Sequence, residues 1–362
     1  MKIKFRATTA ALAVTLALMG ILTSCSRQGA GPSGPQSITL NETGSSLLYP
    51  LFNLWVPAYT QDNPSVRITP QSTGSGTGIA QAVEGIVQIG ASDAYISDAQ
   101  MKQHPDMLNI PLAISMQMVN YNLPGLNKDH LKMSGPVLAG IYEGKIRYWD
   151  DVAIRKLNPG VHLPHHGIIP VHRTDGSGDT FIFTQYLSFS TPAWNKSVGY
   201  GTTVSWPPVS GGIGAVGNPG MVTAIQDNPY SIAYIGTSFQ DAIEKAQLGI
   251  AALENHDGKF VLPEAKTAAA AAAVMVPKTP KDQRISLIFA SGPDSYPIIN
   301  YEYALVNRQQ PSAEMAAALR KFFTWAISPS GGNAPHFMEA VHFVPLPDAV
   351  AQLSAAQIAE IQ

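Results

Sequence analysis

The chain has 362 residues, a formal net charge of −2 and one cysteine, and only 13% of its residues are charged. This length favours two domains over one, and the near-neutral charge argues against a broad nucleic-acid-binding surface, which needs a stripe of lysine and arginine. One cysteine excludes an intrachain disulfide framework and a zinc site built from several cysteines. With 45% hydrophobic residues, the chain can bury a sizeable core.

The amino terminus has the pattern of a secretory signal. Three basic residues within the first six positions precede an apolar run over residues 10–22, which is too short for a confident membrane span. The run ends at LTSC, which resembles a bacterial lipobox, so we expect residues 1–24 to be a signal peptide and Cys25 to be lipidated. The alternative is an ordinary signal peptide with an incidental cysteine. Removal of this segment, which has three basic and no acidic residues, changes the net charge from −2 to −5.

The rest of the chain predicts an α/β fold preceded by a tether. Residues 26–36 are rich in Gly, Pro and Ser and, with Cys25, are expected to form a flexible tether over residues 25–36. From residue 37 onward, short apolar strands repeatedly lead through Gly/Ser turns into helices, which predicts helices packed on sheets. In chain order we predict strand 37–40, helix 47–59, strand 66–69, helix 77–83, strand 87–90, strand 167–171, helix 180–187, helix 221–226, strand 230–235, helix 268–273 and helix 312–328.

The strongest candidate binding segment is the strand-to-helix turn VHRTDGSGDTF at residues 171–181. The start of a helix carries free N–H groups and a partial positive charge, and it therefore attracts anions. Arg173 could hold an oxyanion through two parallel N–H donors, and Asp175 could brace Arg173. The alternative is an ordinary helix cap beside a surface arginine.

Two other Gly/Ser turns follow predicted strands, at residues 43–46 (TGSS) and 72–78 (STGSGTG). The second lacks the lysine of a P-loop and the glycine spacing of a dinucleotide fingerprint. Each turn alone is a weak signal, and a mobile turn is the alternative interpretation. Together, the three turns could direct hydroxyl and backbone donors toward the carboxyl end of a sheet, where ligands of open α/β sheets bind.

Asp93 adds a carboxylate after another predicted strand. An ionised carboxylate only accepts hydrogen bonds, so it suits an anion that carries a proton, such as protonated phosphate. It would leave a desolvated, unpaired charge opposite fully ionised sulfate and would reject it. The alternative for Asp93 is a strand-end turn residue or a helix cap.

Other chemical sites have less support in the sequence. Four histidines lie close together, at His162, His165, His166 and His172. They lack the helical spacing of metal ligands and an evident carboxylate partner, so we predict no metal site. The chain has no G-x-S-x-G motif, the turn that carries the nucleophilic serine of many hydrolases, so the sequence gives no specific support for a hydrolase. We expect no catalytic residues and no cofactor.

Taken together, the segments NETGSSLLYPLFNLW, STGSGTGIAQA, IGASDAYIS, HRTDGSGDTF, YPIINYEYAL and HFVPLP resemble the PstS family, especially its mycobacterial branch. These are the substrate-binding lipoproteins of bacterial phosphate ABC transporters. The resemblance implies a two-lobed periplasmic-binding-protein fold of type II, an α/β fold in which each lobe is a sheet flanked by helices and the ligand lies in the interlobe cleft. The implied lobes are residues 37–120 with 296–362, and residues 121–295, joined by two strand crossovers that form a hinge.

The resemblance also implies a set of phosphate-binding residues: Ser46, Leu47, Ser75, Asp93, Arg173, Ser177, Gly178 and Asp179, with Asp175 in support. The serines would donate hydrogen bonds, Leu47 and Gly178 would offer backbone N–H groups, and Asp93 would accept the phosphate proton. Asp179 stands where many members have threonine, and it could accept another proton or shift the preference between monobasic and dibasic phosphate.

A member of this family would be a receptor and not an enzyme. It would be lipid-anchored to the cell membrane on the extracytoplasmic side, bind phosphate, deliver it to the permease subunits of an ABC transporter, and bind no nucleic acid. Two alternatives are a receptor for another tetrahedral oxyanion, such as sulfate, and a secreted hydrolase of phosphate esters. The acidic residues Asp93 and Asp179 argue against a sulfate receptor.

Overall fold

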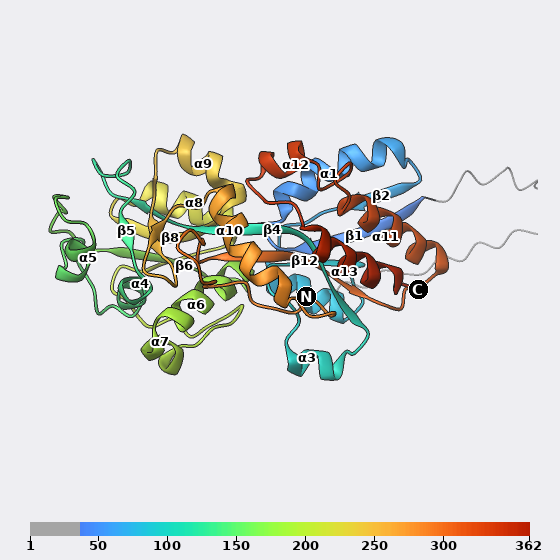
Figure 1. Cartoon of the computed structure of the whole chain (residues 1–362), viewed down its shortest axis with the longest axis horizontal. Coiled ribbons are helices and arrows are strands. Elements are labelled where there is room, and N and C mark those ends of the chain that lie inside the picture. The colour runs from blue at the N-terminus through green and yellow to red at the C-terminus, as the bar shows by residue number, and fades with distance from the viewer. Residues whose placement is uncertain (1–36) are drawn as a thin grey trace, which may run out of the picture. The chain divides into compact units, whose positions relative to one another are not determined.

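The computed structural model describes residues 37–362, which form an α/β fold with helices packed on a mixed sheet (Figure 1). The predicted signal peptide, the lipidation site Cys25 and the tether up to residue 36 lie outside the described residues. None of the helices between residues 37 and 362 is long and apolar enough to cross a membrane.

The main sheet has nine strands and is organised around one long central strand, β4 (Met107–Asn122). On one side of β4 the order is β12 (Ile299–Asn307), β3 (Ile89–Ser92), β1 (Ile38–Gly44) and β2 (Val66–Thr69). On the other side follow β8 (Ser231–Gly236), β6 (Ile169–Arg173) and β7 (Ile213–Ala215), and β9 (Gly249–Ile250) also pairs with β4. A second sheet contains β11 (Phe260–Val261), β10 (Ala252–Glu254) and β5 (Lys132–Met133).

The strand directions make the carboxyl ends of the two groups of strands face each other. Strand β4 pairs with β12 over residues 107–116 and changes partner to β8 at residues 117–122. Strands β1 and β3 run in the same direction as β4, since β12 is antiparallel to both β3 and β4. Strands β8, β6 and β7 run in the opposite direction. The loops that follow β1 and β3 therefore meet those that follow β6 and β7 near the middle of the sheet.

The helices cover both groups of strands (Figure 1). They are α1 (Tyr49–Asp62), α2 (Ser75–Val83), α3 (Asp98–Gln103), α4 (Gly135–Tyr142), α5 (Val152–Leu157), α6 (Gly178–Ser190), α7 (Pro192–Ser197), α8 (Gly217–Asp227), α9 (Gln240–Lys245), α10 (Ala265–Met275), α11 (Ala313–Ala326), α12 (Pro335–Ala340) and α13 (Asp348–Ala359), with short 3₁₀ turns at Thr237–Phe239 and Val276–Lys278. Strand 66–69 has the bounds predicted from the sequence, and the other predicted elements are present with ends shifted by a few residues.

The carboxyl-terminal helices return to the amino-terminal strands and share a core with them (Figure 1). Trp55 of α1 packs edge-on against Phe322 of α11, with ring centroids 6.3 Å apart. The indole N–H of Trp55 also donates to the Gly332 carbonyl at 2.9 Å. The apolar face predicted for helix 312–328 is buried here, because Leu319, Phe322 and Phe323 are fully covered. The first and last parts of the described chain thus form one packing unit around β1 to β3.

Candidate anion-binding site

On the β1–β3 side, the site is built around the buried carboxylate of Asp93. Strand β3 ends at Ser92, so Asp93 is the first residue beyond it, and it is 1% exposed. The hydroxyl of Ser45, just after β1, donates to Asp93 Oδ1. The hydroxyl of Ser75, at the start of α2, accepts from the Asp93 N–H at 3.2 Å and lies 3.4 Å from Oδ2. Three loops that are distant in sequence thus converge on one carboxylate.

On the β6–β7 side, the site is built around the guanidinium of Arg173, the last residue of β6. Its Nε donates to Asp175 Oδ1 at 2.7 Å, Nη2 also donates to Asp175, and Nη1 donates to Asp179 Oδ2 at 2.8 Å. The backbone N–H of Arg173 donates to the hydroxyl of Tyr234 at 2.9 Å. The structure therefore places Asp175 as the predicted brace of Arg173, and it also pairs Arg173 with Asp179 inside the protein.

Asn218, at the start of α8, connects the two sides. Its side-chain N–H₂ group donates to Ser46 Oγ at 3.0 Å and to Asp179 Oδ2 at 2.8 Å, and its backbone N–H donates to Ser46 Oγ at 3.1 Å. Its side-chain oxygen Oδ1 accepts from the Gly236 N–H at 3.0 Å. Since Ser46 Oγ accepts two hydrogen bonds from Asn218, the hydroxyl proton of Ser46 is available for another acceptor.

Glycines allow the loops of the two sides to touch. The Gly76 N–H donates to the Gly176 carbonyl at 2.8 Å. A side chain at Gly74, which has φ +89°, would come within 2.6 Å of Asp175 Oδ2, and a Cβ at Gly178 would overlap the Asp93 carboxylate. Only glycine permits this approach, so the first turn of α6 lies directly against Asp93.

The first turn of α6 also supplies backbone donors. Ser177 caps the helix, because its Oγ accepts from the Thr180 N–H at 3.2 Å. The N–H groups of Gly178 and Asp179 have no carbonyl partner earlier in the helix, as at any helix start. The Leu47 N–H, in contrast, donates to Ser45 Oγ at 3.1 Å, so this predicted donor has an internal partner in the structure.

Burial governs the electrostatics of the cluster. Burial raises the pKa of Asp93, although hydrogen bonds from the serines and the charge of Arg173 oppose it. Burial and the charge of Asp93 raise the pKa of Asp179 to about 7 despite its contact with Arg173. For Asp175, the bonds and charge of Arg173 outweigh burial and lower the pKa. The two carboxylates in turn outweigh burial of Arg173 and raise its pKa, so the guanidinium remains charged.

Four residues of the cluster were not predicted from the sequence: Ser45, Gln117, Asn218 and Glu302. Gln117 of β4 donates to Asp179 Oδ1 at 3.1 Å, and Glu302 of β12 lies opposite Asp93, next to the paired residues Tyr303 and Ser92. Ser45 lay within the predicted turn 43–46, beside Ser46, so its position was indicated although its role was not. Glu302 lies within the segment YPIINYEYAL that carries the family resemblance, but nothing in that segment indicated its position at the site. Gln117 and Asn218 lie in elements without a distinctive motif, and only the fold brings all three residues to the site.

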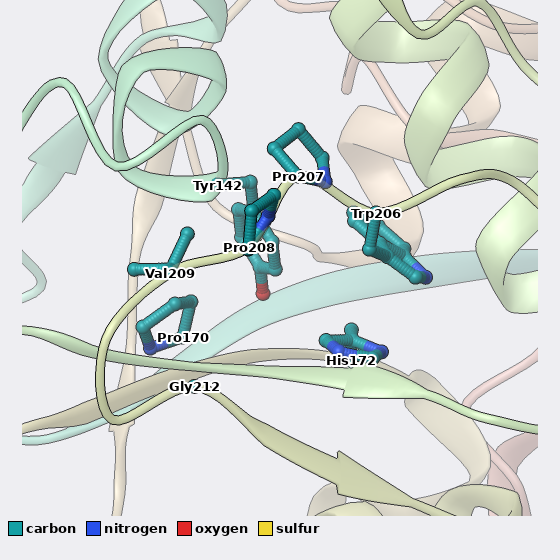
Figure 2. A pocket seen from close by; sticks show the side chains of 8 residues that line it. All are labelled: Tyr142, Pro170, His172, Trp206, Pro207, Pro208, Val209 and Gly212. Atoms are coloured by element: carbon teal, nitrogen blue, oxygen red, sulfur yellow. The ribbon is translucent and has the colours of Figure 1, made fainter.

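A cavity beside β6 has a different chemistry. Figure 2 shows a pocket of about 300 Å³ with Trp206 and His172 toward one end and Pro170 and Val209 toward the other. His172 stacks on Trp206 with ring centroids 5.1 Å apart. No Asp, Glu, Lys or Arg lines this pocket, so it lacks the charges that an anion site requires.

The clustered histidines have separate partners. His165 stacks on Tyr148 and contacts Asp150 at 3.0 Å, and His166 stacks on Tyr230. Within residues 37–362, no group of three or more His, Cys, Asp or Glu side chains could hold a metal ion. His165, His166 and His172 thus each stack on the ring of a neighbouring aromatic residue.

Comparison with known proteins places this geometry in a family. Residues 29–330 match the PBP superfamily domain. The phosphate-binding protein PstS of Methanocaldococcus jannaschii is 35% identical, over 93% of this chain and 90% of its own, and the phosphate-binding protein PstS 3 of Mycobacterium leprae is 28% identical, over 88% and 87%. PfluDING, a high-affinity periplasmic phosphate-binding protein solved with phosphate, has the same fold, with a TM-score of 0.70 at 20% identity over 88% and 93% of the two chains. The chain belongs to the PstS family of phosphate-binding proteins within the PBP superfamily.

Proposed function

We propose that this protein is a non-enzymatic receptor that binds inorganic phosphate outside the cytoplasmic membrane and delivers it to the permease of an ABC transporter. The observation that carries the proposal is the pairing of Asp93 with the first turn of α6. A buried acceptor-only carboxylate lies against free helix N–H donors, next to the buried cation Arg173. Such a site stabilises an oxyanion that brings its own proton, because that proton can bind Asp93.

The proposed ligand shell has the residues expected from the sequence. Ser46 and Ser75 would donate from their hydroxyl groups, and Gly178 and Asp179 from the start of α6, with Ser177 as the cap. Arg173 would pair with the anion while Asp175 fixes its orientation. Leu47 would reach phosphate only if its N–H leaves Ser45, so we expect its contribution to be small.

Binding would be coupled to motion of two lobes, residues 37–120 with 296–362 and residues 121–295. The change of partner along β4 at residues 116–117 supports a hinge close to that boundary. We propose that the contacts of Gly76 with Gly176 and of Ser46 with Asn218 form when the lobes close. Small-angle scattering with and without phosphate tests this, because closure reduces the radius of gyration.

Titration calorimetry with phosphate, sulfate and a phosphate monoester, together with a turnover assay, tests the proposed function. Tight phosphate binding, weak sulfate binding and no ester hydrolysis are the expected result. Equal binding of sulfate would contradict the role given to Asp93, and turnover of the ester would favour a hydrolase.

We further propose that Cys25 is lipidated and anchors the chain to the cell membrane. The support is the signal pattern of residues 1–24 and the position of the only cysteine directly after it. Labelling of the full-length chain in cells with a fatty acid should modify the wild type and not Cys25→Ser. Equal labelling of both would exclude lipidation at this residue.

A further inference from the structure

Glu302 is a fully buried carboxyl group directly behind the proposed ligand shell. It lies in β12, the strand between β3 and β4, and it is 0% exposed. Its Oε1 accepts from the hydroxyl of Ser115 on β4 at 2.6 Å. Its other oxygen, Oε2, receives no N–H or hydroxyl donor from the described part of the chain. The antiparallel register pairs Tyr303 of β12 with Ser92 of β3, so the next residues along, Glu302 and Asp93, lie opposite each other at the end of this pairing.

Two carboxyl groups that lie opposite each other in a buried site retain one proton between them, because two adjacent carboxylates repel each other and neither can donate a hydrogen bond. The contacts of Asp93 favour its ionised form. Ser45 Oγ already accepts from the N–H groups of Leu47 and Leu48, both at 3.1 Å, so its own proton must point at Asp93. Arg173 adds a nearby positive charge.

Glu302 has fewer contacts that favour an ionised form. Ser115 is its one hydroxyl donor among residues 37–362, and no cation is bonded to it there. The titratable groups that face it are Asp93 beyond β3, Asp179 in α6 and Tyr303 on its own strand. Burial and the charge of Asp93 raise the pKa of Glu302 well above its ordinary value. The proton therefore belongs on Glu302.

We propose that Glu302 is a positioning residue that holds a proton at neutral pH and donates a hydrogen bond through it to Asp93, which keeps Asp93 ionised and able to accept the proton of the bound anion. The inference rests on the proposed function, because it explains how an acidic group beside an anion site stays ionised. It also accounts for Oε2, the oxygen without another donor, which would carry the shared proton.

Substitutions at residue 302 separate this role from simple packing. Glu302→Gln keeps the shape, an acceptor for Ser115 and an N–H donor for Asp93, so the preference for phosphate over sulfate should be retained. Glu302→Leu removes the donor, so Asp93 should protonate more readily. The affinity for phosphate should then fall about tenfold or more, and the affinity for sulfate should fall less. A folded Glu302→Leu variant with the wild-type preference would overturn the proposal.

The pH profile gives a second test by calorimetry. At alkaline pH the wild-type pair can lose its proton and place a second negative charge behind the anion, which weakens binding. Glu302→Gln has no such proton, so its phosphate affinity should decline less than the wild-type affinity as the pH rises. Identical alkaline declines in both proteins would count against a proton held by Glu302.

Infrared spectroscopy observes the proton directly and needs no ligand. The carbonyl band of a buried protonated carboxylic acid should be present in the wild type at neutral pH, and the component from Glu302 should disappear in Glu302→Gln. Glu42 of β1 provides the matched control, because it is also buried, with one oxygen lacking a donor and a pKa raised by burial, but it has no contact with Asp93. Glu42→Gln should remove its own band component without altering the pH profile.

The outcomes separate failure of this inference from failure of the proposed function. If the infrared spectrum of Glu302→Gln lacks no band component of the wild type, Glu302 is ionised in the wild type. That result would overturn the inference, whatever the protein binds. Absence of phosphate binding in the wild type would remove the proposed function, while the infrared result would still establish whether the pair shares a proton.

Discussion

The two sides of the candidate site contribute opposite chemistry. The loops after β1 and β3 supply hydroxyl groups and the carboxylate of Asp93, whereas the loops after β6 and β7 supply Arg173 and the start of α6. Asp93 is held mainly by neutral donors, while Arg173 is held by two carboxylates. In the proposed function, the β1–β3 side would therefore recognise the proton of the ligand, and the β6–β7 side would balance its charge.

The largest expected effect comes from removing the charge on the β6 side. Arg173→Ala should weaken phosphate binding by about two orders of magnitude or more, because truncation of one partner in a buried charged network leaves the other charges unpaired. Calorimetry measures the loss, and thermal unfolding checks that the variant is folded. Arg67→Ala, at an exposed position of β2, is the control and should bind as the wild type does.

Arg173→Lys sharpens this prediction. Lysine keeps the positive charge but cannot form the planar two-donor contact with Asp175. We expect an intermediate loss of affinity. Full wild-type affinity would show that charge alone suffices and that the fork geometry described for Arg173 is dispensable.

On the β3 side, the expected effect is on selectivity. Asp93→Asn replaces an acceptor-only group by an amide that can also donate, so the preference for phosphate over sulfate should shrink by about tenfold. Competition calorimetry with both anions measures the ratio. The control Asp62→Asn, at an exposed position at the end of α1, should leave the ratio of phosphate to sulfate affinity unchanged. A ratio that stays constant in Asp93→Asn would mean that Asp93 does not read the ligand proton.

The connection between the sides should have a smaller effect. Asn218→Ala removes the donors to Ser46 and Asp179, and we expect phosphate affinity to fall about three- to tenfold, the size of one or two hydrogen bonds. The exposed change Asn195→Ala is the matched control. If Asn218→Ala binds phosphate as tightly as the control, this bridge has no part in the bound state.

The last expected effect concerns stability without ligand and does not involve binding. The pKa of Asp179 is raised to about 7 from an ordinary value of 3.8, so between these values the folded protein holds a proton that the unfolded chain has lost. Stability from this group is therefore complete at low pH and is lost as the pH rises through 7. Asp179→Asn cannot titrate, so from pH 5 to pH 8 the wild type should lose about 1–3 kcal/mol relative to the variant.

Thermal or urea unfolding across this pH range measures that difference. The sign is the decisive result, because a carboxylate stabilised mainly by Arg173 would have a lowered pKa and would gain stability as the pH rises. A variant whose stability falls in parallel with that of the wild type would show that Asp179 does not titrate in this range.

The sequence determined the local elements and the motifs at the strand ends. Short strands such as 66–69 and the amphipathic helix at 312–328 follow from hydrophobic spacing, which is a local property. The candidate binding turn at residues 171–181, the contact of Asp175 with Arg173 and the place of Asp93 after a strand were also predicted, because glycines, hydroxyls and charges lie close together in the chain. The positions of glycine-rich turns can be predicted from the sequence without knowledge of tertiary contacts.

The tertiary structure alone determined how those motifs are connected. The long strands β4 and β12 are buried along nearly their whole length, so they show no apolar–polar alternation that would predict their partners. The pairing of β12 with β3 brings Glu302 opposite Asp93, and the central place of β4 brings Gln117 to Asp179 in α6, although these residues are far apart in the sequence. A buried proton depends on which groups face it in space, so its location could be decided only once the sheet had placed them together.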